Sequence, residues 1–324
     1  MSEGVVLLNA KGRILSYNSG ALRLLGAVSP AEQASVLTLD RSDAFRTVVE
    51  RALAGQRAQG RLERGERCVQ LLADPVFHQT QVEGAVLVLV DITAQEQGER
   101  LRREFTANVS HELKTPLTAI SGMAEIMKDG IVKPEDINGF AGDIYRESQR
   151  LIALVEDIIH LSRLDEGGDG LKMEPVDLLE LARQTAGRLE PVARRAEVSI
   201  QVKGSPAKVR GVPAVLDEMV FNLCDNAVKY NQTGGSVTVS VEPGEHETVL
   251  TVADTGIGIP DQDRDRVFER FYRVDKSHSR QIGGTGLGLS IVKHAAALHD
   301  ARIDLDSVLG KGTTIRVHFP GGTP

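Results

Sequence analysis

The feature that most restricts how this sequence can fold is a heptad repeat of apolar residues between positions 137 and 161. The repeat has two rows, interrupted only by Glu147, which consist of Ile137, Ile144, Leu151 and Ile158 together with Phe140, Leu154 and Leu161. A repeat sustained over four heptads predicts a long helix whose apolar stripe must be covered by other helices.

A second helix is predicted just upstream. Between positions 101 and 127 the apolar residues recur every three or four positions, as Leu101, Phe105, Val109, Leu113, Leu117, Ile120, Ala124 and Met127. The segment Asp129 to Asp136 contains Gly130 and Pro134 and separates the two helices. Two helices cannot bury such broad apolar faces against each other alone, whereas pairing with a second copy into a four-helix bundle would bury both. We therefore expect a homodimer through residues 93–166; the alternative is a helical hairpin docked on the chain's own remaining domains.

The segment before the helical pair, positions 4–92, contains short strands separated by turns. Its pattern predicts a hairpin of Gly4 to Asn9 with Arg13 to Tyr17, a helix at Asp43 to Ala54 and a closing strand at Gly84 to Asp91. These elements indicate a small α+β domain.

The segment after the pair, positions 176–320, alternates helices with strands. Helices are expected at 178–195, 214–230 and 286–299, and strands at 198–202, 207–210, 236–242, 248–253, 302–306 and 313–319. This alternation predicts an α/β sandwich with helices on one face of a mixed sheet. The stretch Glu166 to Gly170 is expected to be a flexible linker. The whole chain is therefore expected to be a multidomain α+β protein.

Composition excludes several other classes. A length of 324 residues favours two or three domains, and the net charge of −7 argues against nucleic acid as the main partner. No apolar run approaches the ~20 residues of a membrane span, and no signal peptide is present, so the chain as it stands is expected to be soluble. Cys68 and Cys224 lie outside any metal-ligand spacing and are expected to be buried, reduced thiols.

His111 stands in the middle of the first predicted helix, in the stretch FTANVSHELKTPLT. Pro116 removes a backbone donor and clashes with the carbonyl of Glu112, at a cost of about 3 kcal/mol, so its place beside a histidine indicates function. Imidazole is nucleophilic near neutral pH, and Glu112 could set its tautomer, although adjacent helical residues do not face each other. Thr115 shares the face of His111 and could orient a water for dephosphorylation; equally, its hydroxyl could bond back to the His111 carbonyl.

A polar helical face in the last domain is the first of three clusters that together indicate a nucleotide site. Glu218, Asn222 and Asn226 recur every four residues, with Lys229 near the same side. Amide and carboxylate oxygens suit Mg²⁺, which keeps several waters for phosphate ligands. The asparagines could instead be helix caps or hydrogen-bonding groups of the core.

The other two clusters are glycine-rich loops. Asp254 ends a strand and opens DTGIGIP; its carboxylate can accept from the exocyclic amine of adenine, and Gly256 and Gly258 allow close approach of the backbone. The stretch GGTGLGLS at 283–290 leads into a helix, where backbone donors favour phosphate. It is neither a Walker loop nor a Rossmann fingerprint. Between these loops, FERFYR at 268–273 supplies aromatics and arginines, and the polar stretch 275–281 is expected to be a mobile lid.

These motifs, in this order, resemble those of bacterial two-component sensor histidine kinases, in particular the phosphate-regulon and cell-wall sensor kinase-like subfamily. HELKTP resembles the phospho-acceptor box, NLCDNAVKYN the asparagine box, and DTGIGIP, FERFYR and GGTGLGLS the remaining nucleotide-binding boxes. The resemblance covers essentially the whole chain. It implies a PAS-like sensor domain at 1–92, a dimerisation and histidine-phosphotransfer hairpin at 93–166, and a GHKL-type ATP-binding domain at 167–324. DIT at 91–93 resembles the usual exit of a PAS domain into a signalling helix.

The resemblance also implies roles for individual residues. His111 would be the phospho-acceptor, Glu112 its acid–base partner, Thr115 an aid to phosphatase activity and Glu218 a group close to the transferring phosphate. Asn222 would bind Mg²⁺ and Asp254 would read the adenine of ATP. Together with Asp254, the residues that would contact the nucleotide or hinge the lid are Asn222, Asn226, Lys229, Tyr230, Gly256, Gly258, Ile259, Phe271, Arg273, Gly284, Thr285, Gly286, Leu287 and Gly288.

The expected function is therefore ATP-dependent autophosphorylation of His111, followed by transfer to an aspartate of a response regulator. The resemblance further implies phosphatase activity towards that regulator and a membrane-anchored parent, of which this chain is the cytoplasmic portion. Two other functions remain open: an ATPase clamp of the gyrase or chaperone type, and a non-catalytic dimeric sensor scaffold. The stimulus, the cognate regulator and the choice between transfer within or between subunits cannot be read from the sequence.

Overall fold

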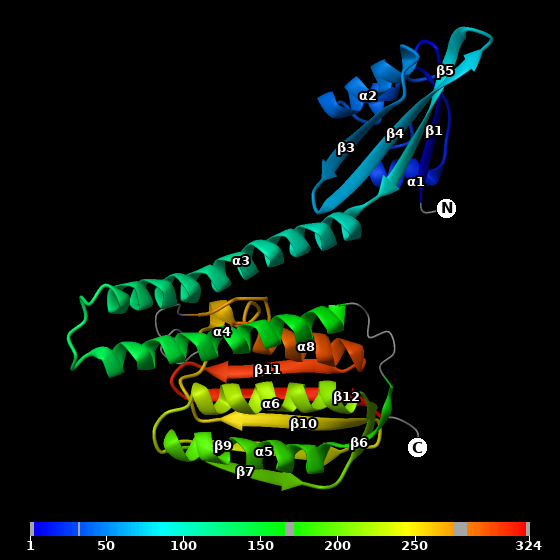
Figure 1. The fold of residues 1–324 in the computed structure, drawn as a ribbon. Coiled ribbons are helices and arrows are strands. Elements are labelled where there is room, and N and C mark those ends of the chain that lie inside the picture. Colours follow the sequence, from blue (N-terminus) through cyan, green and yellow to red (C-terminus); the bar gives the residue numbers. More distant parts are fainter. Residues whose placement is uncertain (1–2, 32, 166–171, 275–283, 322–324) are drawn as a thin grey trace. The chain divides into compact units, whose positions relative to one another are not determined.

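The computed structural model describes residues 3–31, 33–165, 172–274 and 284–321, and for 163–165 it describes only the backbone. The chain divides into two compact units, Met1–Ala107 and Asn108–Pro324. Each unit is described by itself (Figure 1). The expected linker at 166–170 and the expected lid at 275–281 lie outside the described residues.

The first unit is an antiparallel sheet with two helices on one face. Its five strands lie in the order β2-β1-β5-β4-β3, with bounds β1 Gly4–Asn9, β2 Ile14–Tyr17, β3 Ala58–Arg64, β4 Arg67–His78 and β5 Gln81–Asp91. Helices α1 (Ser19–Leu25) and α2 (Asp43–Leu53) pack on it, and a 3-10 turn spans Val36–Thr38. Their core centres on Phe45, Leu71, Leu87 and Leu89, all fully buried. The predicted hairpin, helix and closing strand are confirmed.

Strand β5 continues directly into helix α3 (Thr93–Lys128) through the DIT motif. The Asp91 carboxylate accepts from the backbone N–H of Thr93 at 3.0 Å. The Thr93 hydroxyl accepts from the backbone N–H of Cys68 in β4 at 2.9 Å. These bonds tie the first turn of α3 to two strands of the sheet.

Two long helices form the predicted hairpin. Helix α3 ends at Lys128 and α4 spans Ile137–Asp165, so the break expected at 129–136 is confirmed. Pro116 is the one buried residue of α3. In the described part of the hairpin, large apolar side chains remain exposed at Leu101, Leu117, Ile126, Ile137, Ile152, Val155 and Ile159. Such exposure is typical of an interface that a partner covers.

The heptad rows of α4 do not share one environment. Leu154 and Leu161, from the second row, are buried where α4 packs against helix α8 (Gly288–Leu298). Ile144, Leu151 and Ile158, from the first row, are only half-buried. The alternative to a dimer, docking of the hairpin on the chain's own last domain, therefore explains the burial of part of the second row. The first row remains available for contacts with another partner.

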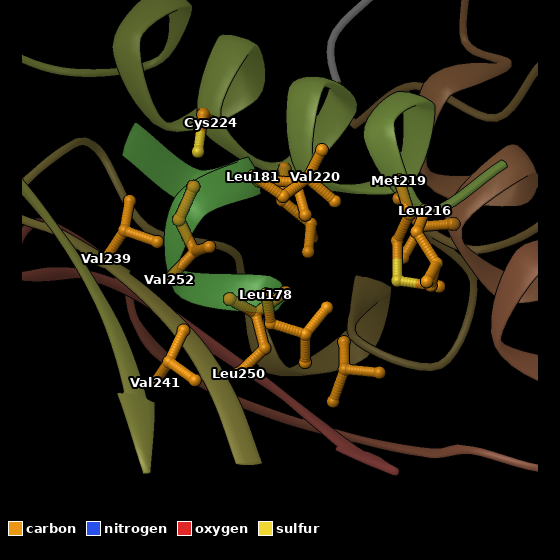
Figure 2. Packing of buried hydrophobic residues seen from close by; sticks show 14 of the residues in the cluster. Leu178, Leu181, Leu216, Met219, Val220, Cys224, Val239, Val241, Leu250 and Val252 are labelled. Carbon is orange, nitrogen blue, oxygen red and sulfur yellow. The ribbon is translucent and has the colours of Figure 1, made fainter. Parts of the chain in front are cut away.

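The last domain is an α/β sandwich, as predicted. Its sheet has the order β11-β12-β10-β9-β7, with bounds β7 Ser199–Gly204, β9 Ser236–Pro243, β10 Glu247–Asp254, β11 Arg302–Val308 and β12 Gly312–Pro320. Only the β7–β9 pair is parallel. Helices α5 (Leu178–Arg195), α6 (Pro213–Lys229) and α8 cover one face of this sheet, and a 3-10 turn spans Asp261–Asp263. Figure 2 shows apolar side chains of α5 and α6 meeting those of β9 and β10 in the core.

Three details differ from expectation. The strand expected at 207–210 is β8 (Lys208–Gly211), which pairs only with a short strand, β6 (Glu174–Asp177), that the sequence pattern does not predict. The helix expected from Gly286 begins two residues later, because Gly286 has a left-handed φ of 77° that no α-helix accommodates. Cys224 is buried as expected, but Cys68 is only half-buried.

His299 joins two helices from within the core of the last domain. It follows the end of α8, and its Nε2 accepts from the backbone N–H of Val212, just before α6, at 2.9 Å. Its Nδ1 lies 2.6 Å from the carbonyl oxygen of Ala295, so the neutral tautomer with the proton on Nδ1 satisfies both contacts. Burial lowers the pKa of His299 below its ordinary value of 6.5, although the Ala295 carbonyl and Asp300 act in the opposite direction.

We expect His299 to make the last domain acid-sensitive. Because its folded pKa is depressed, its contribution to stability is present above the unfolded value of 6.5 and is lost as the pH falls below it. His299→Gln should lower the free energy of unfolding at pH 7 by about 1–2 kcal/mol and flatten its decline towards pH 5. Thermal unfolding at several pH values measures both effects, with the exposed His246→Gln as control. An unchanged pH slope in His299→Gln would contradict this assignment.

Candidate functional site

Two asparagines of α6 face the beginning of α8. The side-chain N–H of Asn222 donates to the carbonyl oxygen of Glu218 at 3.0 Å, which leaves its Oδ1 directed away from α6. A Cβ atom placed on Gly288 would lie 2.7 Å from this Oδ1 and 3.6 Å from Nδ2 of Asn226. A side chain at position 288 would therefore have to displace the Asn222 side chain, so the asparagine cluster lies directly beside the last glycine loop.

The start of α8 is a ready acceptor for an anion. Its first residue is Gly288, and the preceding Leu287 makes no side-chain capping bond. The first backbone N–H groups of a helix have no partner within it, and the helix dipole adds positive potential there. Phosphate oxygens suit such a position. Thr285 supports the turn before it, since its hydroxyl accepts from the backbone N–H of Leu287 at 3.3 Å.

This site also suits a divalent cation of the Mg²⁺ type. Oδ1 of Asn222 is a hard oxygen that lies next to the phosphate-accepting start of α8. In the described ranges, no group of three or more His, Cys, Asp or Glu side chains could hold a metal alone. A cation here would therefore take most of its ligands from phosphate and water, as Mg²⁺ commonly does.

Asp254, the last residue of β10, has a half-buried carboxylate, one oxygen of which accepts hydrogen bonds from the backbone. Oδ1 accepts from the backbone N–H of Gly256 at 2.8 Å and from that of Thr313 at 3.2 Å. Both bonds reach the same oxygen, and among the described residues none reaches Oδ2. Burial raises the pKa of Asp254, while the two backbone donors act in the opposite direction. The arrangement holds one acceptor oxygen rigidly for an amino group of a ligand.

The loop after Asp254 is shaped by glycines. A Cβ on Gly256 would lie 2.3 Å from the carbonyl oxygen of Tyr230, and one on Gly258 would lie 2.2 Å from that of Val308. Ile259 then donates its backbone N–H to the Ser307 hydroxyl at 2.8 Å. Glycine at these two positions therefore allows the loop to pack closely against the backbone at Tyr230 and Val308.

The arginine-aromatic segment is joined to the last glycine loop. Phe271 has a left-handed φ of 63°, and its N–H donates to the carbonyl oxygen of Gly286 at 2.8 Å. A Cβ on Gly286 would meet the Phe271 backbone at 3.0 Å, and one on Gly284 would meet the Tyr230 hydroxyl at 3.0 Å. The structure therefore brings Tyr230, Phe271 and both glycines together.

Lys229 has a partner that the sequence reasoning did not anticipate. Its ammonium forms an ion pair with Asp225, one turn earlier in α6, at 2.6 Å. The charge that Lys229 could offer to a ligand is therefore partly compensated.

His111 is exposed on α3, whereas its neighbours are engaged elsewhere. The Thr115 hydroxyl donates to the carbonyl oxygen of His111 at 3.2 Å, which is the second of the two roles considered for it. Oε2 of Glu112 lies 3.2 Å from the Arg273 guanidinium and 3.9 Å from that of Arg150 in α4. Adjacent helical positions diverge, so Glu112 faces these arginines. The described contacts do not join the His111 ring to Asn222 or Asp254.

Helix α4 contributes two side chains that sequence reasoning missed. The Thr285 hydroxyl donates to Oδ2 of Asp157 at 2.6 Å. Nδ1 of His160 lies 2.5 Å from Oε1 of Glu218. Asp157 and His160 are separated from their partners by 128 and 58 positions, so no local motif could reveal these contacts. The sequence signal that could have indicated them is that Asp157 and His160 stand directly beside the heptad residues Ile158 and Leu161.

Two protein-family models match the chain from residue 101 onwards. Residues 101–167 match the family described as the His Kinase A (phospho-acceptor) domain. Residues 211–323 match the family described as Histidine kinase-, DNA gyrase B-, and HSP90-like ATPase.

Curated relatives match almost the whole chain. The sensor histidine kinase WalK of Bacillus subtilis is 34% identical over 333 residues, which cover 99% of this chain and 54% of that protein. The sensor protein kinase WalK of Staphylococcus aureus is 33% identical over 331 residues, which cover 99% of this chain and 79% of that protein. The chain thus spans about half of the Bacillus relative.

Solved structures share the fold. The full-length histidine kinase ShkA in complex with AMPPNP has a TM-score of 0.51 and 29% identity, over 68% of this chain and 46% of that one. The histidine kinase ThkA, solved in complex with the response regulator protein TrrA, has a TM-score of 0.54 and 21% identity, over 98% of this chain and 95% of that one. Because the identity with ThkA is only 21%, this comparison supports the fold alone.

Proposed function

Because this chain belongs to the sensor histidine kinases of bacterial two-component systems, we propose that it phosphorylates its own His111 from ATP and passes the phosphoryl group to an aspartate of a response regulator. The observation that carries the proposal is the seating of Gly288 against Asn222, which combines helix N–H donors with a hard oxygen in one place. That pairing suits a triphosphate with its cation.

ATP is the proposed phosphoryl donor. Asp254 would accept from the exocyclic amine of adenine through Oδ2, and the glycine-shaped loop would bring the backbone against the base. Guanine presents a carbonyl oxygen at that position and would be repelled. The match of residues 211–323 to an ATPase family supports this donor.

Mg²⁺ is the proposed cation, held by Asn222 with the phosphate oxygens and water. When bound, it would neutralise charge on the phosphates. Asn226, Tyr230, Phe271 and the loop residues from Gly284 to Gly288 would surround the nucleotide, with Lys229 nearby. Glu218 would lie close to the transferring phosphate.

The transfer step is an in-line displacement. A ring nitrogen of His111 forms a bond to the γ-phosphorus as the bond from that phosphorus to the β,γ-bridging oxygen breaks, and ADP leaves. Glu112 would hold the proton on the other ring nitrogen and so keep the attacking nitrogen free. For this the Glu112 carboxylate must turn away from Arg273. Catalysis would consist mainly of positioning and charge neutralisation.

The phosphohistidine would then be attacked by a carboxylate of the response regulator, which leaves His111 neutral. Directly beyond His111, one face of α3 bears an open hollow of about 420 Å³, lined by Ser110, Leu113, Lys114, Leu117, Thr118 and Ser121. This face would receive the regulator. Thr115 would take part in the reverse, phosphatase reaction only after its hydroxyl leaves the His111 carbonyl.

The proposed organisation has three domains: a PAS-like sensor at 1–92, a dimerisation hairpin at 93–166 and the ATP-binding domain from 167. Among the described residues, no helix combines the length and apolar character that a membrane span requires. We also propose that this chain is the cytoplasmic portion of a membrane-anchored protein; it covers 54% of the length of the Bacillus relative. Fractionation of cells that produce the whole gene product tests this; recovery only in the soluble fraction would contradict it.

We expect autophosphorylation to depend on His111. Incubation with γ-labelled ATP and Mg²⁺ should label the wild-type chain, and His111→Gln should lower the labelling by more than about 100-fold because the nucleophile is lost. The exposed His246→Gln serves as the matched control and should be labelled normally. Absence of label on the wild type, or full label on His111→Gln, would contradict the proposal.

We expect Asp254 to decide the choice of nucleotide. Asp254→Asn should weaken binding of ATP by about 10- to 100-fold, because a charged acceptor is lost, and should reduce discrimination against GTP. Protonation should have the same effect as the pH falls, and at a higher pH than for an ordinary aspartate, since burial raises the pKa of Asp254. Calorimetric titration with both nucleotides measures this. Equal affinity for ATP in wild type and variant would exclude the assigned role.

We expect the exposed stripe on α4 to form the dimer. Ile152, Val155 and Ile159 are each more than 40% exposed and share one helical face. Analytical ultracentrifugation should give twice the chain mass of 35.0 kDa. Ile159→Asp should shift the equilibrium to monomer, whereas Leu15→Asp, an exposed change in the first unit, should not. A monomeric wild type would refute this prediction.

A further inference from the structure

The turn between β11 and β12 packs against the loop at 255–259. The N–H of Gly310 in the turn donates to the carbonyl oxygen of Ile257 at 2.7 Å. The hydroxyl of Ser307, near the end of β11, accepts from the backbone N–H of Ile259 at 2.8 Å. Turn and loop are therefore joined by one bond between backbone groups and by one bond that depends on a side chain.

The Ser307 hydroxyl uses every hydrogen bond that it can form. The residue is only 2% exposed. Its hydroxyl donates to the carbonyl oxygen of Gly312 at 3.0 Å and lies 2.9 Å from the hydroxyl of Thr313. A hydroxyl has one donor and two acceptor positions, so Gly312, Thr313 and Ile259 occupy all of them. Because a buried hydroxyl is costly unless it is bonded, this set of partners fixes Ser307 in one orientation.

The two residues that Ser307 holds in β12 are also those that lie against Asp254. The N–H of Thr313 donates to Oδ1 of Asp254 at 3.2 Å. A Cβ atom on Gly312, which has a φ of 121°, would lie 2.0 Å from the carbonyl oxygen of Asp254. Ser307 and Thr313 are direct partners across the two strands. The place of the Asp254 carboxylate therefore depends on the hydrogen bonds that Ser307 makes.

Ser307 thus supports both parts of the site that would receive the base of ATP. We propose that Ser307 is a positioning residue of the adenine subsite, which holds the Asp254 carboxylate and the Ile259 backbone in the arrangement that accepts the base. It acts through these two residues and not by its own contact with the nucleotide. This inference rests on the proposed function, because it takes Asp254 as the group that receives adenine.

The two sides of the loop are held in different ways. On the side of α6 the N–H of Ile257 donates to the carbonyl oxygen of Tyr230 at 3.0 Å, and no side chain takes part. On the other side, Ser307 is the one side chain in the described ranges that bonds to the backbone of 257–259. Groups of a binding site must be held to within about 0.5 Å of the productive geometry. Loss of the Ser307 hydroxyl releases one side of the loop and leaves the other side in place.

The role of Ser307 is confined to the base end of the site. Among the described residues, its hydroxyl bonds to no group of α8 and not to Asn222, where the phosphates and the cation would lie. A group that contributes only to binding raises KM when it is lost and leaves kcat unchanged. Ser307 should therefore affect the affinity for ATP and not the rate of transfer at saturation.

The test begins with calorimetric titration of the full chain with Mg²⁺ and the non-hydrolysable analogue AMPPNP. Ser307→Ala should weaken binding about 5- to 20-fold, because the N–H of Ile259 loses its acceptor. In the labelling assay the same variant should raise KM for ATP by a similar factor and keep the rate at saturating ATP within about twofold. The control is Ser240→Ala, at a half-buried serine of β9, which should leave both quantities within about twofold.

A double-mutant cycle separates positioning of Asp254 from a general effect on the fold. In an Asp254→Asn chain, Ser307→Ala should weaken AMPPNP binding by less than about threefold, because the interaction that Ser307 supports is already lost. The same loss in both backgrounds would show that Ser307 acts independently of Asp254 and would overturn the inference.

Thermal unfolding verifies that each variant is folded. Ser307→Cys, which keeps a similar volume and offers only a weak acceptor, should weaken binding in the same direction and replaces Ser307→Ala if that variant does not fold. Unchanged affinity in the folded Ser307 variants, or a lower kcat at unchanged KM, would overturn the inference and leave the proposed function standing. Absence of AMPPNP binding by the wild type at millimolar concentration would overturn the proposed function, and the role of Ser307 with it.

Discussion

The close approach of α8 to α6 is the constraint on which the nucleotide site depends. A Cβ atom at position 288 would lie 2.7 Å from Oδ1 of Asn222, so the beginning of one helix lies directly against the polar face of another. The remaining parts are arranged around this contact. Asp254 is held at the end of β10 by two backbone donors, and the Phe271–Gly286 bond ties the aromatic segment to the same loop.

The helical hairpin differs from the nucleotide site, because the described part of the chain covers only some of its apolar side chains. One row of α4 is partly buried on α8 through Leu154 and Leu161, while Ile152, Val155 and Ile159 remain exposed. A helix with two apolar faces can serve two partners, one within the chain and one outside it. Asp157 and His160 add polar contacts to the internal packing of α4, with Thr285 and Glu218 respectively.

Sequence reasoning predicted most of this site and missed a definite part of it. Asn222, Asp254 and the glycines could be recognised because their roles depend on local backbone geometry and spacing along one element. The bond from Thr115 to the His111 carbonyl was one of two readings, and spacing alone could not choose between them. The pairing of Glu112 with Arg273, 161 positions away, could not be foreseen because no local motif joins the two residues. The pair of Asp225 and Lys229 has the four-residue spacing of a helical ion pair and was overlooked.

What the sequence determined by itself was most of the elements and the order of the motifs, because periodicity and glycine spacing are local properties. What only the tertiary structure decided was which of their residues meet. The pairing of β8 with β6, the burial of Leu154 and Leu161 where α4 packs on α8, and the contacts of Asp157, His160 and Glu112 all join residues far apart in the chain. Such contacts arise from the packing of whole helices and strands, and a one-dimensional pattern carries no record of which faces that packing brings together.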